Sequence, residues 1–217
     1  MYIIRTNLLN LLKMKLKVLS HYLFDEDMKK MNLNDENVED YNMAFISIIG
    51  TPECLNYYLD EGDTRHYFKD HKNVLNLEFD DIGNDVLYNG HLFKTITMEQ
   101  AEKTVNFIEE MIENGVDVIE GHCRAGMSRS RAIFEFIYRF CREHDIPLDY
   151  EDRNDYTTMY NHGVLNRLNH AYWKRHGLGM YEKKGVEYPD ELVNAPVREI
   201  NRERTREAWK LNKQKQI

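Results

Sequence analysis

Short apolar runs of strand length alternate along the chain with longer segments in which apolar residues recur at helical spacing. The strand-length runs are residues 17–20, 44–49, 73–79 and 116–120. The second run ends in Gly50-Thr51-Pro52, the third follows a two-residue alternation, and the fourth comes after the breaker Asn114-Gly115. The sequence therefore predicts core strands at these four places.

Three segments carry the helical pattern. Thr97, with Gln100 three residues later, has the pattern of a capping box, and the apolar repeat after it predicts a crossover helix. A second apolar stripe runs from Ile133 to Cys141, which places Cys141 in the core. A third helical pattern covers residues 164–172. Strands that alternate with helices indicate an α/β fold, with a central, mostly parallel sheet flanked by helices.

Length and charge narrow the classes of protein. A chain of 217 residues without a visible linker favours one domain, and the net charge of −8 argues against a general binder of nucleic acids or anionic membranes. The three cysteines, Cys54, Cys123 and Cys141, are too few and too scattered for a disulfide framework or a zinc site. This usage favours a reducing, cytoplasmic setting.

The two ends of the chain differ from the middle. Residues 1–13 are interrupted by polar side chains, so we expect an N-terminal extension and neither a signal peptide nor a membrane span. The main domain is expected over residues 14–195. Residues 196–217 are rich in lysine and arginine and predict a basic, helical tail, which is either solvated or in contact with an acidic partner.

The most informative stretch is GHCRAGMSRSRAIFEFIYRF, residues 121–140. It places a loop between a predicted strand and a predicted helix, where α/β sheets bind ligands and where free N–H groups favour an anion. That positive helix end and Arg129 both favour the thiolate form of Cys123. Arg129 also offers a planar fork for two phosphoryl oxygens, and Gly126 allows the tight turn. These residue types suit capture of a phosphate and nucleophilic attack on it.

A bare Cys-x5-Arg pattern arises easily by chance, whereas the added His, Gly and Ser make it specific. The segment His122-Cys123-Arg124-Ala125-Gly126-Met127-Ser128-Arg129-Ser130, here called the signature loop, resembles the signature of the cysteine-dependent protein tyrosine and dual-specificity phosphatases. The resemblance extends in outline from about Met14 to about Arg175. It implies a dual-specificity phosphatase-like fold and hydrolysis of phosphomonoesters through a phosphocysteine, without metal or cofactor.

The resemblance also implies roles for individual residues. Cys123 is the expected nucleophile, Ser130 stabilises it as a leaving group, and His122 orients the loop. The phosphate-binding residues would be Arg124, Ala125, Gly126, Met127, Ser128 and Arg129. Ordinary alternatives are a buried structural cysteine for Cys123 and a helix cap for Ser130.

The family's reaction also needs a general acid from a loop upstream. The candidates in LEFDDIGND are Asp80, Asp81 and Asp85, of which Asp81 best matches the family's acid relative to its strand. Turn chemistry is the expected role of the other two. The chain has no Trp-Pro-Asp motif, and the 42-residue separation of Asp81 and Cys123 (123 − 81) is long for the compact dual-specificity type. The choice among the three aspartates therefore stays open.

The expected partner is a phosphorylated substrate, most simply a phosphoprotein. Alternatives are a catalytically silent phosphate-binding module, or an RNA 5′-phosphatase or phosphoinositide phosphatase. The loop has no lysine, and Arg124 is its only extra charge, which disfavours a highly charged inositol head group. The remaining histidines show no metal-ligand spacing, and we expect most of them at the surface: His66, His71, His91, His144, His162, His170 and His176.

Overall fold

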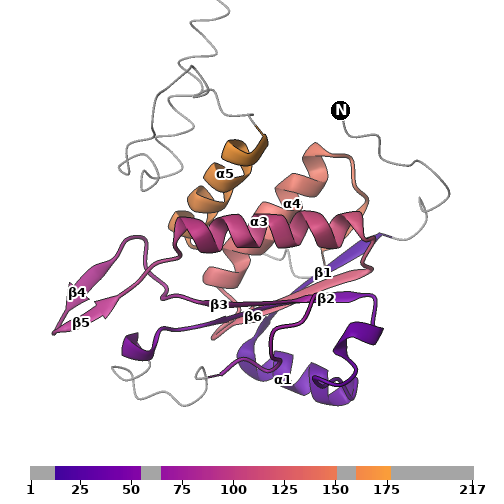
Figure 1. The fold of residues 1–217 in the computed structure, drawn as a ribbon, viewed down its shortest axis with the longest axis horizontal. Coiled ribbons are helices and arrows are strands. Elements are labelled where there is room, and N and C mark those ends of the chain that lie inside the picture. Colours follow the sequence, from indigo (N-terminus) through magenta and orange to yellow (C-terminus); the bar gives the residue numbers. More distant parts are fainter. Residues whose placement is uncertain (1–12, 55–64, 151–159, 177–217) are drawn as a thin grey trace, which may run out of the picture.

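The structure, a computed structural model, describes residues 13–54, 65–150 and 160–176. Five parallel strands form the central sheet in the order β3-β2-β6-β1-β7 (Figure 1). Their bounds are β1 Met14–Ser20, β2 Met43–Ile49, β3 Val74–Glu78, β6 Val118–Cys123 and β7 Leu148–Tyr150. The predicted α/β class and the parallel sheet are confirmed, and β6 lies at the centre of the sheet.

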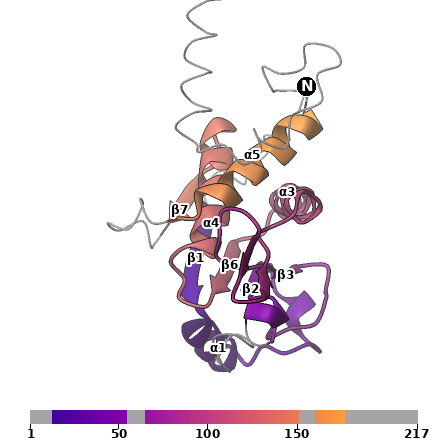
Figure 2. The same ribbon diagram turned by 90° about the vertical axis from the view of Figure 1, so that its left-hand side faces the viewer.

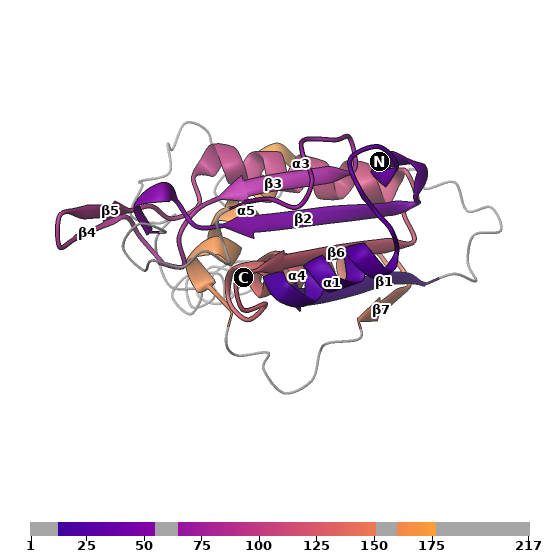
Figure 3. The same cartoon turned by 90° about the horizontal axis from the view of Figure 1, so that it is seen from below.

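Helices cover both faces of this sheet. Helices α3 (Met98–Glu113), α4 (Arg129–Glu143) and α5 (His162–His176) lie on one face, and α1 (His21–Lys30) lies on the other (Figures 1 and 3). A short 3-10 turn, η1, spans Val38–Asp40. Figure 2 shows the sheet between the two helical layers.

Each face of the sheet has its own apolar core. The larger core joins the sheet to α3, α4 and α5, and the smaller one centres on Phe24 of α1 and Phe45 of β2. Cys141 is fully buried in the larger core, as expected, and burial raises the pKa of its thiol to about 12. The predicted capping box at Thr97 and Gln100 is present. The helical periodicity in the sequence therefore identified the faces that pack on the sheet.

Helix α1, the turn η1, strand β7 and a β-hairpin were not predicted from the sequence. The hairpin pairs β4 (Val86–Tyr88) with β5 (His91–Phe93). Asn89 and Gly90 both have positive φ, +49° and +80°, the backbone of a two-residue primed turn that suits the twist of a hairpin. The turn dipeptide therefore determines a hairpin here.

The described residues begin just before β1, which starts at Met14. The expected extension lies outside them apart from residue 13, and so do the basic tail at 196–217 and residues 177–195 of the expected domain. Within the described ranges, no helix is long and apolar enough to cross a bilayer.

Candidate active site

The signature loop lies at the carboxyl end of the central strand. Strand β6 ends at Cys123, and α4 begins six residues later at Arg129. Cys123 is 2% exposed, so its sulfur lies at the base of the loop rather than on the surface. No acidic residue occupies the first turn of α4. The positive end of the helix dipole is therefore left for a ligand or for the Cys123 thiolate.

Two glycines, Gly126 in the signature loop and Gly121 just before it in β6, allow close packing here. Gly126 has φ +69°, and a Cβ built on it would lie 2.6 Å from the backbone carbonyl of Leu19. A Cβ on Gly121 would lie 2.7 Å from the ring of Phe134. Neither contact leaves space for a side chain, so the loop's path depends on glycine at both places. The loop is also held where the His21 N–H donates to the Arg124 carbonyl at 3.2 Å.

A serine hydroxyl contacts the cysteine sulfur. Ser130, fully buried in the first turn of α4, donates to Cys123 Sγ over 3.1 Å. A hydroxyl donor at this distance stabilises negative charge that develops on sulfur. Ser130 is not the cap of α4, because the N-cap residue is Ser128 and it makes no side-chain capping bond.

Arg129 links the signature loop to the preceding strand end. Its Nη1 donates to the Phe79 carbonyl at 2.9 Å, and the residue is 6% exposed. Phe79 directly precedes the three candidate aspartates. One arginine therefore couples the signature loop to the segment that carries the candidate acid.

The three aspartates have different surroundings. Asp81 is exposed, and its Oδ1 accepts hydrogen bonds from Ser128 Oγ at 2.7 Å and from Asn161 Nδ2 at 2.9 Å. Asp80 is buried and accepts from two backbone N–H groups, those of Thr51 and Lys94, and from the Thr51 hydroxyl, each at 2.8 Å.

Asp85 accepts from the backbone N–H of Thr95 at 2.9 Å. Asp80 and Asp85 therefore fix backbone at the two ends of the aspartate loop, residues 80–85. Among the three, Asp81 is the one whose hydrogen bonds reach the signature loop.

Two residues that sequence reasoning missed hold the aspartate loop against α5. Asn161 binds Asp81 through Nδ2, accepts from Val164 N through Oδ1 at 3.1 Å, and donates from its own N–H to the Ser128 carbonyl at 3.2 Å. Arg167 Nη1 donates to the Gly83 carbonyl at 3.1 Å. Asn161 just before an apolar helical run carries a capping signal, but its contact with Asp81 spans 80 residues of sequence and has no local signal.

His122 lies beneath the loop, fully buried. Its Nε2 lies 2.9 Å from Ser47 Oγ on the neighbouring strand β2. Burial is the main reason that the pKa of this imidazole falls to about 3, and the positive charges of its neighbours His21, His66 and Arg129 act in the same direction. His122 is therefore neutral at neutral pH.

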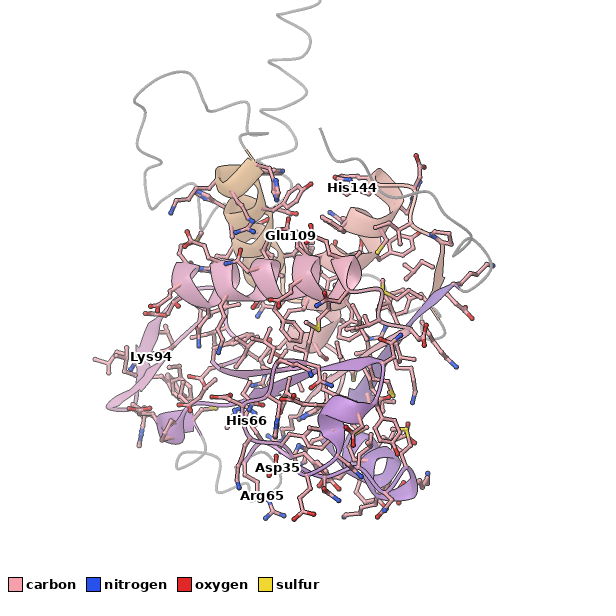
Figure 4. All side chains as sticks on the ribbon, turned by 45° about the vertical axis from the view of Figure 1, so that its right-hand side comes forward. Asp35, Arg65, His66, Lys94, Glu109 and His144 are labelled. Atoms are coloured by element: carbon pink, nitrogen blue, oxygen red, sulfur yellow. The ribbon has the colours of Figure 1, made fainter. Side chains whose placement is uncertain are left out.

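We expected most of the other histidines at the surface, and all seven have some exposure. His162 is exposed, and the other six are partly buried. They are partly buried because most of them pack beside carboxylates, hydroxyls or rings; His66, for example, lies 2.8 Å from Ser47 Oγ. Figure 4 shows His66 on the α1 side of the sheet, whereas His144 and Glu109 lie on the opposite side.

Within the described part of the chain, no group of three or more histidine, cysteine or acidic side chains is arranged to hold a metal ion. All three cysteines are free thiols. The site is thus built from a buried thiol, a hydroxyl, a guanidinium and a carboxylate. No protein-family model matches the sequence, and no curated protein matches it significantly.

Proposed function

We propose that this protein is a phosphomonoester hydrolase that acts through a phosphocysteine, of the protein tyrosine and dual-specificity phosphatase type, working in the cytoplasm. The observation that carries the proposal is the 3.1 Å contact from Ser130 Oγ to Cys123 Sγ, at a helix N-terminus with no acid of its own. That setting favours both a thiolate and a bound phosphate. A structural cysteine needs neither a hydroxyl donor nor a positive helix end.

The first chemical step forms the phosphocysteine. The Cys123 thiolate attacks phosphorus in line with the leaving oxygen, so an S–P bond forms as the P–O bond breaks. The loop N–H groups and Arg129 bind the equatorial oxygens, whose charge they stabilise. Asp81 gives its proton to the leaving oxygen, because an alkoxide leaves poorly without one.

The second step releases phosphate. Asp81, now a carboxylate, takes a proton from a water molecule that attacks phosphorus, and the S–P bond breaks to return the thiolate. The Ser130 hydroxyl stabilises the charge that returns to sulfur. Both contacts of Asp81 use Oδ1, and its Oδ2 has no hydrogen-bond partner among the described residues. Oδ2 is the oxygen that would carry the proton.

A phosphoprotein is the substrate class that the exposed part of the loop favours. Arg124, Ala125 and Met127 are exposed, and no lysine is present in the loop. One arginine beside an apolar Met127 suits a phosphorylated side chain on a polypeptide better than a head group with several phosphates.

The test is hydrolysis of an aryl phosphate in excess chelator. We expect turnover by the wild type, none by Cys123→Ser, and unchanged turnover by Cys54→Ser, which removes a thiol outside the loop. Undiminished activity of Cys123→Ser would exclude the mechanism.

A phosphate-binding module without catalysis is the alternative, because two hydrogen bonds tie Asp81 to Ser128 and Asn161 in this structure. If the wild type binds vanadate and a phosphopeptide but releases phosphate from no ester, the protein is a phosphate-binding module and not an enzyme.

A further inference from the structure

A chain of side chains leads from the signature loop along the α1 face of the sheet to a second histidine. Ser47 is 2% exposed, and its hydroxyl lies 2.9 Å from His122 Nε2 and 2.8 Å from His66 Nδ1. The register of the sheet makes this possible, because Ser47 of β2 is paired with His122 of β6. The mechanism above leaves both Ser47 and His66 without a role.

The hydroxyl between the two rings connects their protonation states. A serine hydroxyl has one proton, so it can donate to one ring nitrogen only and must accept from the other. His122 is neutral and has one N–H and one bare nitrogen. Whichever tautomer His122 adopts, Ser47 and His66 must adopt the complementary one. Three buried or partly buried groups therefore share a single hydrogen-bond direction, and removing one of them leaves the others mismatched.

The same network fixes where the His122 ring lies. The ring packs against Phe24 at a centroid distance of 4.4 Å and against His21 at 5.0 Å. The contacts with Phe24 and His21 fix the faces of the His122 ring, and the hydrogen bond with Ser47 fixes the orientation of its Nε2 edge. His122 directly precedes Cys123, so these contacts of its ring anchor the backbone at the start of the signature loop. The loop N–H groups that stabilise the thiolate depend on that backbone.

We propose that His66 and Ser47 are positioning residues, which act through the His122 ring to keep the signature loop in the form that stabilises the Cys123 thiolate. This inference rests on the proposed function only in taking Cys123 as the reactive thiol. The charged and titratable groups around His66 are His21, Asp70 and Lys103. Those around His122, besides His66, are His21 and Arg129, and Asp25 lies 3.9 Å from His21.

The thiolate itself provides the test. For each variant, the ultraviolet absorbance of the full chain is titrated against pH, and the curve of its Cys123→Ser counterpart is subtracted. The difference isolates the Cys123 thiolate from the other cysteines and the tyrosines. We expect His66→Ala and Ser47→Ala each to lower the thiolate fraction of Cys123 about tenfold on the acidic side of the curve. The double variant should shift no further than the single ones, because both break one chain.

Two further variants test whether the hydrogen bond between His66 and Ser47, rather than the loss of any histidine from this segment, alters the titration. In His66→Asn, the side-chain amide nitrogen is as many bonds from the backbone as Nδ1, so it can still bond Ser47 and should restore the titration. His71→Ala removes another histidine of the same segment, one that lies 2.9 Å from Asp35 and does not contact Ser47. We expect it to leave the thiolate titration unchanged.

An unshifted titration in His66→Ala, or an equal shift in His71→Ala, would overturn the inference. This titration requires no turnover, so it remains decisive even if the protein proves to hydrolyse no phosphate ester. Conversely, an active enzyme with an unshifted titration would contradict the positioning role alone.

Discussion

Two consecutive aspartates, Asp80 and Asp81, have different surroundings and therefore different expected roles. Asp80 is buried and binds the backbone N–H groups of Thr51 and Lys94. Asp81, the next residue, is exposed and binds Ser128 of the signature loop. The chain turns at Asp81, where the Ile82 N–H donates to the Asp80 carbonyl at 2.9 Å, so the two neighbouring side chains lie in different surroundings. The contrast assigns loop structure to Asp80 and leaves Asp81 as the candidate acid.

The Asp81→Asn change tests this assignment. We expect it to slow hydrolysis of esters with poor leaving groups by ~10²–10⁴-fold, because proton transfer to the leaving oxygen is lost. Activated aryl esters should be affected less, since their leaving groups need little protonation. A series of aryl phosphates of graded leaving-group acidity measures this, with vanadate affinity as a check that binding is intact.

Asp85→Asn is the matched control, because Asp85 contacts backbone of the same segment without reaching the signature loop. It should leave the leaving-group dependence nearly unaltered. A selective loss in Asp85→Asn and none in Asp81→Asn would show that the acid is placed wrongly, and the assignment of Cys123 as nucleophile would survive. Asp80→Asn is a poorer probe, since it removes buried bonds and destabilises the loop as a whole.

At the scale of elements, α5 stabilises the aspartate loop as well as covering the sheet. Its first turn approaches that loop so closely that a Cβ on Gly163 would lie 2.9 Å from the Gly83 carbonyl. Asn161 joins both elements by capping α5 and binding Asp81. The helix and the candidate acid are thus coupled through one amide side chain.

Variants of Asn161 separate its two contacts. Asn161→Ala loses both the cap and the bond to Asp81, so we expect stability to fall by about 1 kcal/mol and activity to fall as well. Asn161→Ser keeps a capping oxygen on a shorter side chain, so its stability should stay near that of the wild type while activity drops as in the alanine variant. Urea unfolding and turnover of an aryl phosphate measure the two effects. Wild-type activity in Asn161→Ser would show that the bond to Asp81 is dispensable.

For the whole molecule, the buried His122 makes stability depend on pH. Its pKa of about 3 in the folded protein lies below the ordinary value of 6.5, so the unfolded chain binds more protons between these values. Stability is therefore full above about pH 6.5 and is lost as the pH falls toward about 3. Between about pH 6.5 and pH 5 the expected loss from this residue is about 1.5 kcal/mol.

Urea midpoints at a series of pH values measure this dependence. His122→Asn removes the titrating ring, so its stability curve should be flatter than that of the wild type over the same range. Burial also lowers the pKa of His66 and His170, so part of the slope should remain in the variant. Equal slopes in both proteins would mean that His122 does not titrate on unfolding.

Local patterns in the sequence were sufficient for the elements with strong periodicity. The four predicted strands, the capping box at Thr97 and the stripe on α4 are present. The signature loop could be read in the same way, because its cysteine, glycine and arginine lie within seven consecutive residues. Helix α1, the three-residue β7 and the hairpin were missed; the two strands of the hairpin are short and mostly exposed, so hydrophobic alternation barely marks them.

The sequence by itself determined the α/β class, the crossover helix and the residues of the signature loop, since each of these depends on neighbours within a few positions. Only the tertiary structure decided which aspartate meets the loop, that Asn161 joins Asp81 to α5, and that Ser47 lies between His66 and His122. Those contacts join residues 80, 75 and 19 positions apart. They follow from the order and register of parallel strands, which bring distant strand ends to one edge of the sheet, and no local pattern of residues records that register.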